Sequence, residues 1–168
     1  MQGKTGERGG RERRYWLFKS EPSTFSFDDL KGRPERTEHW DGVRNFQARN
    51  YLRQEIQVGD RLLFYHSSIP EPVIVGIAEV VRGGYPDWTS WDPESGHFDP
   101  RSTEAKPLWY MVDVRYLRPF PRPVTRSELK AIPELAGMVL LKKSRLSIQP
   151  VSEAEWRVIL RLGGIEEG

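Results

Sequence analysis

The chain has 168 residues and no cysteine, and its 26 Lys and Arg outweigh its 24 Asp and Glu by a formal net charge of +2. This length fits one domain with one core. The lack of cysteine excludes disulfides, thiolate metal ligands and cysteine nucleophiles, and it is typical of a reducing compartment, so we expect a cytoplasmic location. No apolar run is long enough to span a bilayer or to act as a signal peptide, so no membrane partner is expected.

The charge is unevenly distributed. Residues 1–14 hold five basic and two acidic side chains, a net +3, which leaves about −1 for the rest of the chain. Because this segment has no apolar residue between Met1 and Tyr15, we expect 1–14 to be a disordered basic tail, either without function or touching phosphates, ahead of one domain at 15–165. A body with so little net charge can bind a phosphate backbone only through a local patch.

The first half of the domain contains short strands, a turn and one helix. Tyr15 to Phe18 is an aromatic and apolar run that predicts a buried strand ended by Pro22. Residues 26–32 predict one helical turn with acids at its positive end, and the Asp-Gly pair at 41–42 predicts a tight turn that exposes a tryptophan. Apolar residues at helical spacing predict an amphipathic helix over 45–57.

The second half adds longer strands and two capped helices. Residues 61–66 and 73–82 predict two strands, and the Pro- and Gly-rich segment 83–107 predicts a long irregular loop. Alternating polarity over 109–120 predicts a half-buried strand. The pairs Thr125 with Glu128 and Ser152 with Glu155 match the capping box at a helix start. These elements favour an α+β barrel in one piece, without repeats.

Several kinds of catalytic site are disfavoured. His39, His66 and His97 are too far apart for a helical metal-ligand pair, so no metal is expected. The glycine pairs lack the spacing of a phosphate-binding loop, so ATP and nicotinamide cofactors are not expected, and no cofactor is assigned. No nucleophile-elbow pattern supports a serine hydrolase.

Four spaced segments carry a family resemblance. They are Tyr-Trp-Leu-Phe-Lys-Ser-Glu-Pro at 15–22, Trp-Asp-Gly-Val-Arg-Asn at 40–45, Tyr-His-Ser at 65–67 and Arg-Leu-Ser-Ile-Gln-Pro-Val at 145–151. Together they resemble the EVE domain family of the PUA-like superfamily, from about residue 15 to residue 162. The resemblance implies a PUA-like β-barrel of five to six strands with flanking helices and a deep pocket, related in form to the YTH domains that read methylated adenine in RNA. Eukaryotic members of the family look like readers of modified cytosines in DNA.

The resemblance also implies a set of pocket residues. These are Trp16, Lys19, Ser20, Trp40, Val43, Arg44, Asn45, Tyr65, His66, Ser67, Ser144, Arg145, Leu146 and Ser147. A flipped base needs aromatic faces to stack on and fixed polar groups at its edge, and these residue types supply both. Stacking contributes roughly 1–3 kcal/mol per base, which is too little for tight binding, so cations must also bind the phosphate backbone. The candidates for this role are Arg49, Arg53, Lys142 and Lys143.

Each of these side chains also has a purely structural interpretation. A strand tryptophan such as Trp16 often fills a core, and His66 can be a satisfied interior imidazole. Arg44 and Asn45 can cap the following helix, and the basic run at 142–145 can be a solvated face.

Three functions therefore remain open. The first is a non-catalytic module that binds nucleic acid, DNA or RNA, and recognises a flipped modified base such as a 5-substituted cytosine. The second is a small hydrolase acting on acylated cytidine, as in the related ASCH branch, with Lys19, Glu21 and either Ser20 or Tyr65 as the reacting set. The third is a plain RNA-binding module. We expect a monomer, and a buffer anion such as sulfate can occupy a pocket that contains Lys19 and Arg44.

Overall fold

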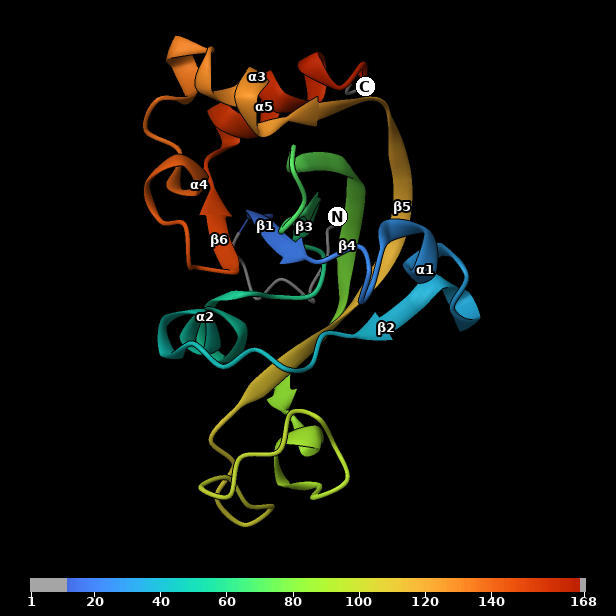
Figure 1. Ribbon diagram of the computed structural model, residues 1–168, viewed down its shortest axis with the longest axis vertical. Helices are drawn as coiled ribbons and strands as arrows, with labels where there is room; N and C mark the ends of the chain where they lie inside the picture. Colours follow the sequence, from blue (N-terminus) through green and yellow to red (C-terminus); the bar gives the residue numbers. More distant parts are fainter. Residues whose placement is uncertain (1–11, 167–168) are drawn as a thin grey trace.

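A six-stranded sheet organises the chain in the computed structural model, which describes residues 12–166 (Figure 1). The strand order is β2-β5-β4-β3-β1-β6, and β1 and β3 are parallel whereas the other neighbours are antiparallel. The strands are β1 (Tyr15–Ser20), β2 (Thr37–His39), β3 (Arg61–His66), β4 (Val73–Pro86), β5 (Tyr110–Thr125) and β6 (Ile148–Val151). The predicted basic tail, 1–14, lies largely outside the described residues.

Short helices flank the sheet. They are α1 (Phe27–Lys31), α2 (Phe46–Asn50), α3 (Arg126–Lys130), α4 (Val139–Lys142) and α5 (Glu153–Leu162), with a π-helical turn η3 (Tyr51–Glu55) after α2 and 3-10 turns η2 (Pro34–Arg36), η4 (Trp88–Trp91) and η5 (Pro133–Leu135). Both predicted capping boxes are present, at the starts of α3 and α5. None of the helices in residues 12–166 is long and apolar enough to cross a membrane.

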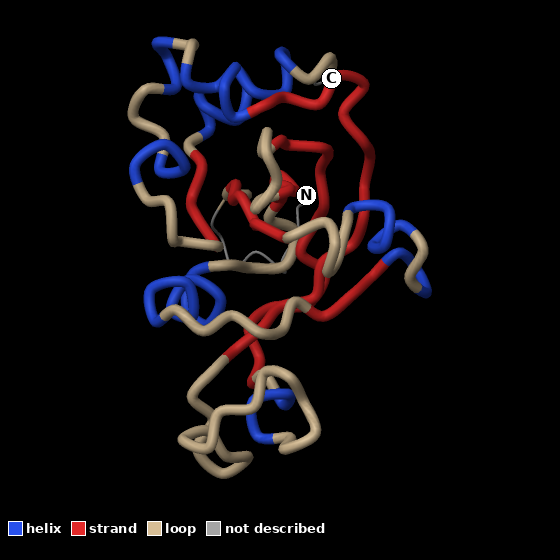
Figure 2. Tube along the Cα trace, viewed as in Figure 1, coloured by secondary structure: helices blue, strands red, loops and turns tan. Residues whose placement is uncertain are grey.

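The predicted barrel is wrong in one respect, because the sheet does not close. The α+β class is confirmed, and β4 and β5 curve strongly, with several register shifts between them (Figure 2). However, β2 pairs with β5 and β6 pairs with β1, so these two strands are the edges of the sheet. β2 has only three residues and β6 only four, which limits the number of hydrogen bonds that could join one edge to the other.

The two faces of the sheet bury two apolar clusters. Side chains alternate between the faces along each strand, so Trp16 and Phe18 pack in one cluster and Leu17 in the other. The cluster of Trp16, which we call the aromatic core, also holds Trp40 and residues of α1 and α2. The cluster of Leu17, which we call the helical core, lies under α3, α4 and α5.

One long excursion leaves the sheet between β4 and β5. It runs from residue 87 to 109 and is mostly loop, with η4 as its helical turn (Figure 2). The irregular loop was predicted over 83–107, but β4 continues to Pro86 and thereby moves the start of the loop. In Figure 1 the excursion projects away from the rest of the molecule, at the opposite end from α3 and α5.

Candidate functional site

A cavity of about 500 Å³ opens beside the aromatic core. It forms where the end of β1, the chain after it, the segment from β2 to α2 and the 87–109 excursion meet. Its lining residues are Lys19, Ser20, Glu21, Thr24, Phe25, Arg33, Glu38, His39, Trp40, Asp41, Gly42, Val43, Arg44, His97 and Ser147. Small-molecule sites in proteins typically measure about 300–1,000 Å³, so this cavity is large enough for a nucleobase.

Two aromatic rings form the apolar part of the cavity. Trp40 is 9% exposed, and its indole packs at an angle against Phe18 and edge-on against Phe64, with ring centroids 5.4 and 5.5 Å apart. Phe25 meets Trp40 edge-on at 6.1 Å, and its ring is covered by the Arg33 guanidinium at 5.1 Å. Each ring is therefore held in contact with its neighbours at the apolar wall.

A buried carboxylate anchors the turn that follows Trp40. Asp87, fully buried at the start of the excursion, accepts hydrogen bonds from Gly42 N at 2.9 Å and Arg44 Nη1 at 3.1 Å. The same carboxylate accepts bonds from the backbone N–H and hydroxyl of Thr89. Asp87 therefore ties one wall of the cavity to the excursion.

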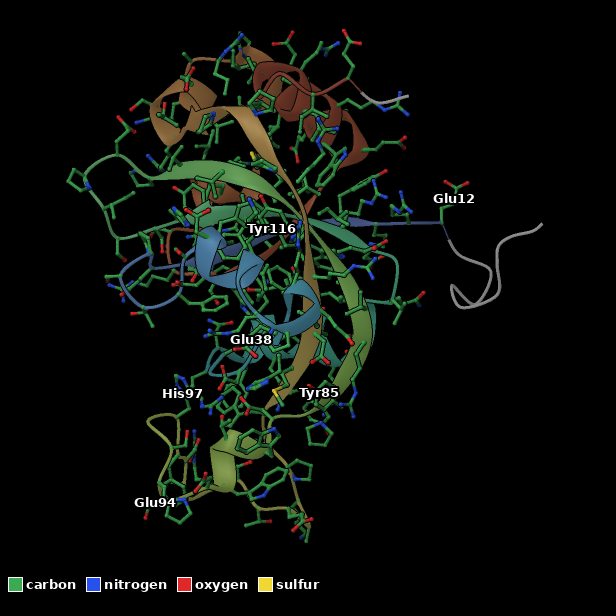
Figure 3. All side chains as sticks on the ribbon, turned by 90° about the vertical axis from the view of Figure 1, so that its right-hand side faces the viewer. Glu12, Glu38, Tyr85, Glu94, His97 and Tyr116 are labelled. Carbon is green, nitrogen blue, oxygen red and sulfur yellow. The ribbon has the colours of Figure 1, made fainter. Side chains whose placement is uncertain are left out.

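Gly42 is favoured by its backbone conformation. Its φ of +83° lies in the left-handed region that glycine adopts without strain. A Cβ at this position would lie 2.7 Å from the ring of His97, so that exposed ring would have to move to make room for a side chain. The excursion thus packs directly on the turn, and Figure 3 shows Glu38 of β2 and His97 of the excursion on the same side of the molecule.

The end of β1 supplies polar groups on the other side of the cavity. Lys19 Nζ donates to the carbonyl of Ser144 at 2.9 Å, which brings the 143–147 segment next to β1. Burial, together with the charge of Arg126, lowers the pKa of the Lys19 ammonium. The Ser20 hydroxyl donates to the carbonyl of Phe25 and so holds the chain that carries that ring.

The structure gathers only part of the predicted pocket set around the cavity. Lys19, Ser20, Trp40, Val43, Arg44 and Ser147 line it. Trp16 does not line it: the indole is fully buried in the aromatic core and donates to Asp60 Oδ2 at 3.0 Å. Tyr65 is buried in the helical core, on the opposite face of the sheet.

Other predicted pocket residues lie behind the cavity wall or beside it. His66 Nε2 accepts a hydrogen bond from Phe27 N at 3.1 Å, and Ser67 N donates to the Ser20 carbonyl at 2.9 Å, so both fix the end of β1 and its flanking chain. Burial lowers the pKa of the His66 imidazole. Asn45 caps α2 by accepting from Ala48 N at 2.9 Å.

A second, shallower hollow of about 240 Å³ brings together α2 and the loop after α4. It is lined by Asn45, Gln47, Lys143, Ser144, Arg145 and Leu146. Lys142, Lys143 and Arg145 are exposed, as phosphate-binding side chains must be. Arg49 is held against Phe46 and donates to the Leu108 carbonyl at 3.1 Å, and Arg53 lies over Tyr110, so both of these cations also have structural contacts.

Sequence reasoning missed several cavity residues. Asp41 and Gly42 lie inside the recognised segment 40–45, so they could have been included on position alone. Phe25 comes from the chain after β1, and His97 comes from the excursion. No local pattern places either of them beside Trp40, because that requires the tertiary fold.

Three members of the set proposed for a hydrolase, Lys19, Ser20 and Glu21, line the cavity, but each is hydrogen-bonded to a residue outside the set. Lys19 donates to the Ser144 carbonyl, Ser20 donates to the Phe25 carbonyl, and Glu21 accepts from the Ser68 hydroxyl at 3.1 Å. Tyr65 lies on the other face of the sheet. Within residues 12–166 these side chains form no nucleophile and base pair. In the same part of the chain, no group of three or more His, Asp or Glu is placed to hold a metal ion.

The structure thus combines a curved α+β sheet with an aromatic, polar-rimmed cavity and an exposed basic loop. The family follows from the sequence. The EVE domain profile matches residues 14–162, so this chain belongs to the EVE domain family, as the four segments indicated. Human thymocyte nuclear protein 1 is 41% identical over 165 residues, which cover 88% of this chain and 73% of the human protein.

Solved structures agree with this assignment. The crystal structure of human THYN1 in complex with DNA that contains 5-methylcytosine is 40% identical and has a TM-score of 0.86, covering 92% of this chain and 99% of that one. The crystal structure of a mutant ZmASCH protein from Zymomonas mobilis has a TM-score of 0.53 and 14% identity, covering 89% of this chain and 99% of that one. At that identity the likeness extends to the fold alone.

Proposed function

We propose that this protein is a non-catalytic nucleic-acid-binding module that recognises a modified base, in the first instance 5-methylcytosine, flipped into the cavity lined by Trp40 and Phe25. The observation that carries the proposal is the close likeness to human THYN1, whose crystal structure contains 5-methylcytosine DNA. The cavity offers the physical properties that such a role requires.

The cavity suits a flat ring with a polar edge. Trp40 and Phe25 present apolar surface to a base and its methyl group, and the carboxylates and cations on the rim supply hydrogen-bonding groups for the edge. Because each ring is already held in contact with its neighbours, binding costs little side-chain entropy. A base buried on this wall gains stacking energy, roughly 1–3 kcal/mol, which offsets part of the cost of unstacking it from its strand.

The exposed basic loop suits the backbone of the same strand. Lys143 and Arg145 flank Ser144 in this loop. The Ser144 carbonyl accepts a hydrogen bond from Lys19, which lines the cavity, so this bond holds the loop beside the cavity. Cations in a loop next to the cavity can neutralise the phosphates on either side of a nucleotide whose base has entered the cavity. This local patch supplies the affinity that the nearly neutral body lacks.

Titration with matched oligonucleotides tests the proposal. Duplex DNA, single-stranded DNA and RNA of one sequence would carry cytosine or 5-methylcytosine at one central position, with binding measured by fluorescence anisotropy at fixed salt. Burying one methyl group in an apolar site contributes about 0.8 kcal/mol, so we expect at least about fourfold tighter binding of the modified strand. Equal affinity for both bases on every scaffold would contradict the reader function, and preference for plain RNA would favour the RNA-binding alternative.

A second measurement tests base flipping itself. A 2-aminopurine placed next to the modified cytosine fluoresces weakly while it is stacked and brightly once its neighbour leaves the helix. We expect its fluorescence to rise on binding to the modified duplex. Tight binding without that rise would mean that the base is read inside the helix.

A further inference from the structure

Three carboxylates line the cavity, and two of them are engaged. Glu38 accepts from Arg33 Nε at 3.0 Å and from His39 N at 3.2 Å, one bond to each oxygen. Glu21 accepts from the Ser68 hydroxyl at 3.1 Å. The third is Asp41, whose carboxyl accepts no hydrogen bond from any other residue in the described part of the chain. Its polar contact is an ion-pair approach of His39 Nε2 at 3.8 Å.

Asp41 is also placed where a ligand edge would lie. It directly follows Trp40 in the chain, both residues line the cavity, and the turn that holds them is fixed through Gly42 by Asp87. The Asp41 side chain is 30% exposed, and burial raises its pKa against the opposing effects of His97 and His39. A partly desolvated carboxyl with free acceptor capacity gains most from a ligand that brings an N–H group.

A hydrogen-bond acceptor such as the Asp41 carboxylate can distinguish cytosine from thymine. Cytosine carries an N4 amine, which donates hydrogen bonds, whereas thymine carries an O4 carbonyl at the same ring position, which only accepts them. Thymine also bears the same 5-methyl group as 5-methylcytosine. An apolar wall that senses only the ring and its methyl group cannot separate the two bases, but a carboxylate at position 4 can.

We propose that Asp41 is the residue by which the cavity rejects thymine, accepting a hydrogen bond from the N4 amine of a cytosine that rests against Trp40. The inference rests on the proposed reader function and adds which edge of the base is read. Thymine would place its O4 oxygen against the carboxylate, where two acceptors face each other without a proton between them.

The test uses the full chain and DNA duplexes that differ at one position. The position holds cytosine, 5-methylcytosine, thymine or 5-methylpyrimidin-2-one, which keeps the ring and methyl group but lacks the amine. Each base lies opposite an abasic site, so that none loses a pairing partner on flipping. The proteins are the wild type, Asp41→Asn and, as a matched control, Glu134→Gln, which removes an exposed carboxylate on η5, outside the cavity. Dissociation constants are measured by fluorescence anisotropy.

We expect the wild type and Glu134→Gln to prefer 5-methylcytosine over thymine and over 5-methylpyrimidin-2-one by about tenfold, the usual value of one good edge contact. In Asp41→Asn the preference over thymine should fall to about twofold or less, because an amide can donate to O4 as readily as it accepts from N4. The ratio between 5-methylcytosine and cytosine should stay as in the wild type.

The outcomes separate this inference from the function on which it rests. If Asp41→Asn still rejects thymine, Asp41 does not read the edge, and the reader function stands on the 5-methylcytosine to cytosine ratio. If the wild type does not distinguish 5-methylcytosine from cytosine, the reader function fails and the inference fails with it. The comparison with 5-methylpyrimidin-2-one needs only the wild type, so it remains available even if Asp41→Asn does not fold. If the wild type binds 5-methylpyrimidin-2-one and 5-methylcytosine with equal affinity, the inference is overturned.

Discussion

The two faces of the sheet differ in what they enclose. The helical core is covered by α3, α4 and α5, and it is filled mainly by aliphatic side chains such as Leu129, Ile159 and Leu160. The aromatic core holds Trp16, Phe18, Phe27, Phe64 and Trp40, and the 500 Å³ cavity opens at its margin. The cavity is built where the rings around Trp40 meet the turn after Trp40 and the 87–109 excursion. Both faces stabilise the fold, and the face of the aromatic core also carries the candidate site.

Replacing Trp40 by Ala should have the largest effect, because Trp40 belongs to both the core and the cavity. We expect a loss of stability of about 3–5 kcal/mol and a loss of affinity for modified DNA of roughly 10- to 100-fold. Thermal melting and anisotropy titration below the melting range measure the two losses. Trp40→Phe is the matched control, since it keeps a ring at the wall. Unchanged affinity in folded Trp40→Ala would remove Trp40 from the site.

Replacing Leu160 by Ala in the helical core sharpens the contrast. Leu160 is 1% exposed, so the change leaves a cavity and should cost about 2–5 kcal/mol of stability. The affinity of the folded protein should stay within about twofold of the wild type, because the site lies on the other face. Denaturant melts and titration at low temperature check both statements. A large affinity loss would mean that the two faces are coupled.

Replacing a cation in the basic loop should have a smaller effect, on affinity and its salt dependence but not on stability. Lys143→Gln and Arg145→Gln are exposed changes, so stability should remain within about 0.5 kcal/mol. Binding should weaken equally for modified and plain DNA, and each change should reduce the slope of log affinity against log salt by about 1. Lys130→Gln in α3 is a control, because Lys130 is exposed on the far side of the sheet. A change in base preference would place these residues at the base edge.

The smallest expected effect is on the pH dependence of stability. Burial lowers the pKa of His66 below its usual 6.5, and its unprotonated Nε2 accepts from Phe27 N. Because the unfolded chain binds the proton more readily, the stabilising contribution is present above pH 6.5 and is lost as the pH falls through the folded pKa. Melting temperatures between about pH 7.5 and 5 should therefore decline less in His66→Gln. Parallel pH profiles for the two proteins would contradict this role.

Local features of the fold were predictable from the sequence. The capping boxes at Thr125 and Ser152 mark helix starts through bonds between near neighbours, and β3 was predicted with its observed ends at 61 and 66. The helix predicted over 45–57 is present as α2 and η3, although its second half winds as a π-turn. Short edge strands such as β2 were missed, because three residues carry no periodicity and pair only when the sheet exists.

The candidate site was harder to predict. The sequence marks Trp16 as a strand tryptophan and Trp40 as an exposed turn tryptophan, but the predicted exposure of Trp40 is wrong: both side chains are buried, and Trp40 alone of the two reaches the cavity. The distinction depends on Asp60 and Asp87, which hold the first indole inside and the turn of the second at the rim. Such long-range contacts leave no pattern in a single sequence. The family resemblance supplied the segments, but the geometry decided which of their side chains face the cavity.

The open edges of the sheet bear on self-association. An uncovered strand invites pairing with another copy, yet β2 and β6 are too short to template a stable ladder. Where β5 runs past β2, it carries Pro119, Pro121 and Pro123 at alternate positions, so the backbone nitrogens along one side of that stretch have no hydrogen to donate. The edges of this open sheet therefore offer few hydrogen-bonding groups to a strand of a second copy, and we expect the chain to remain monomeric at high concentration.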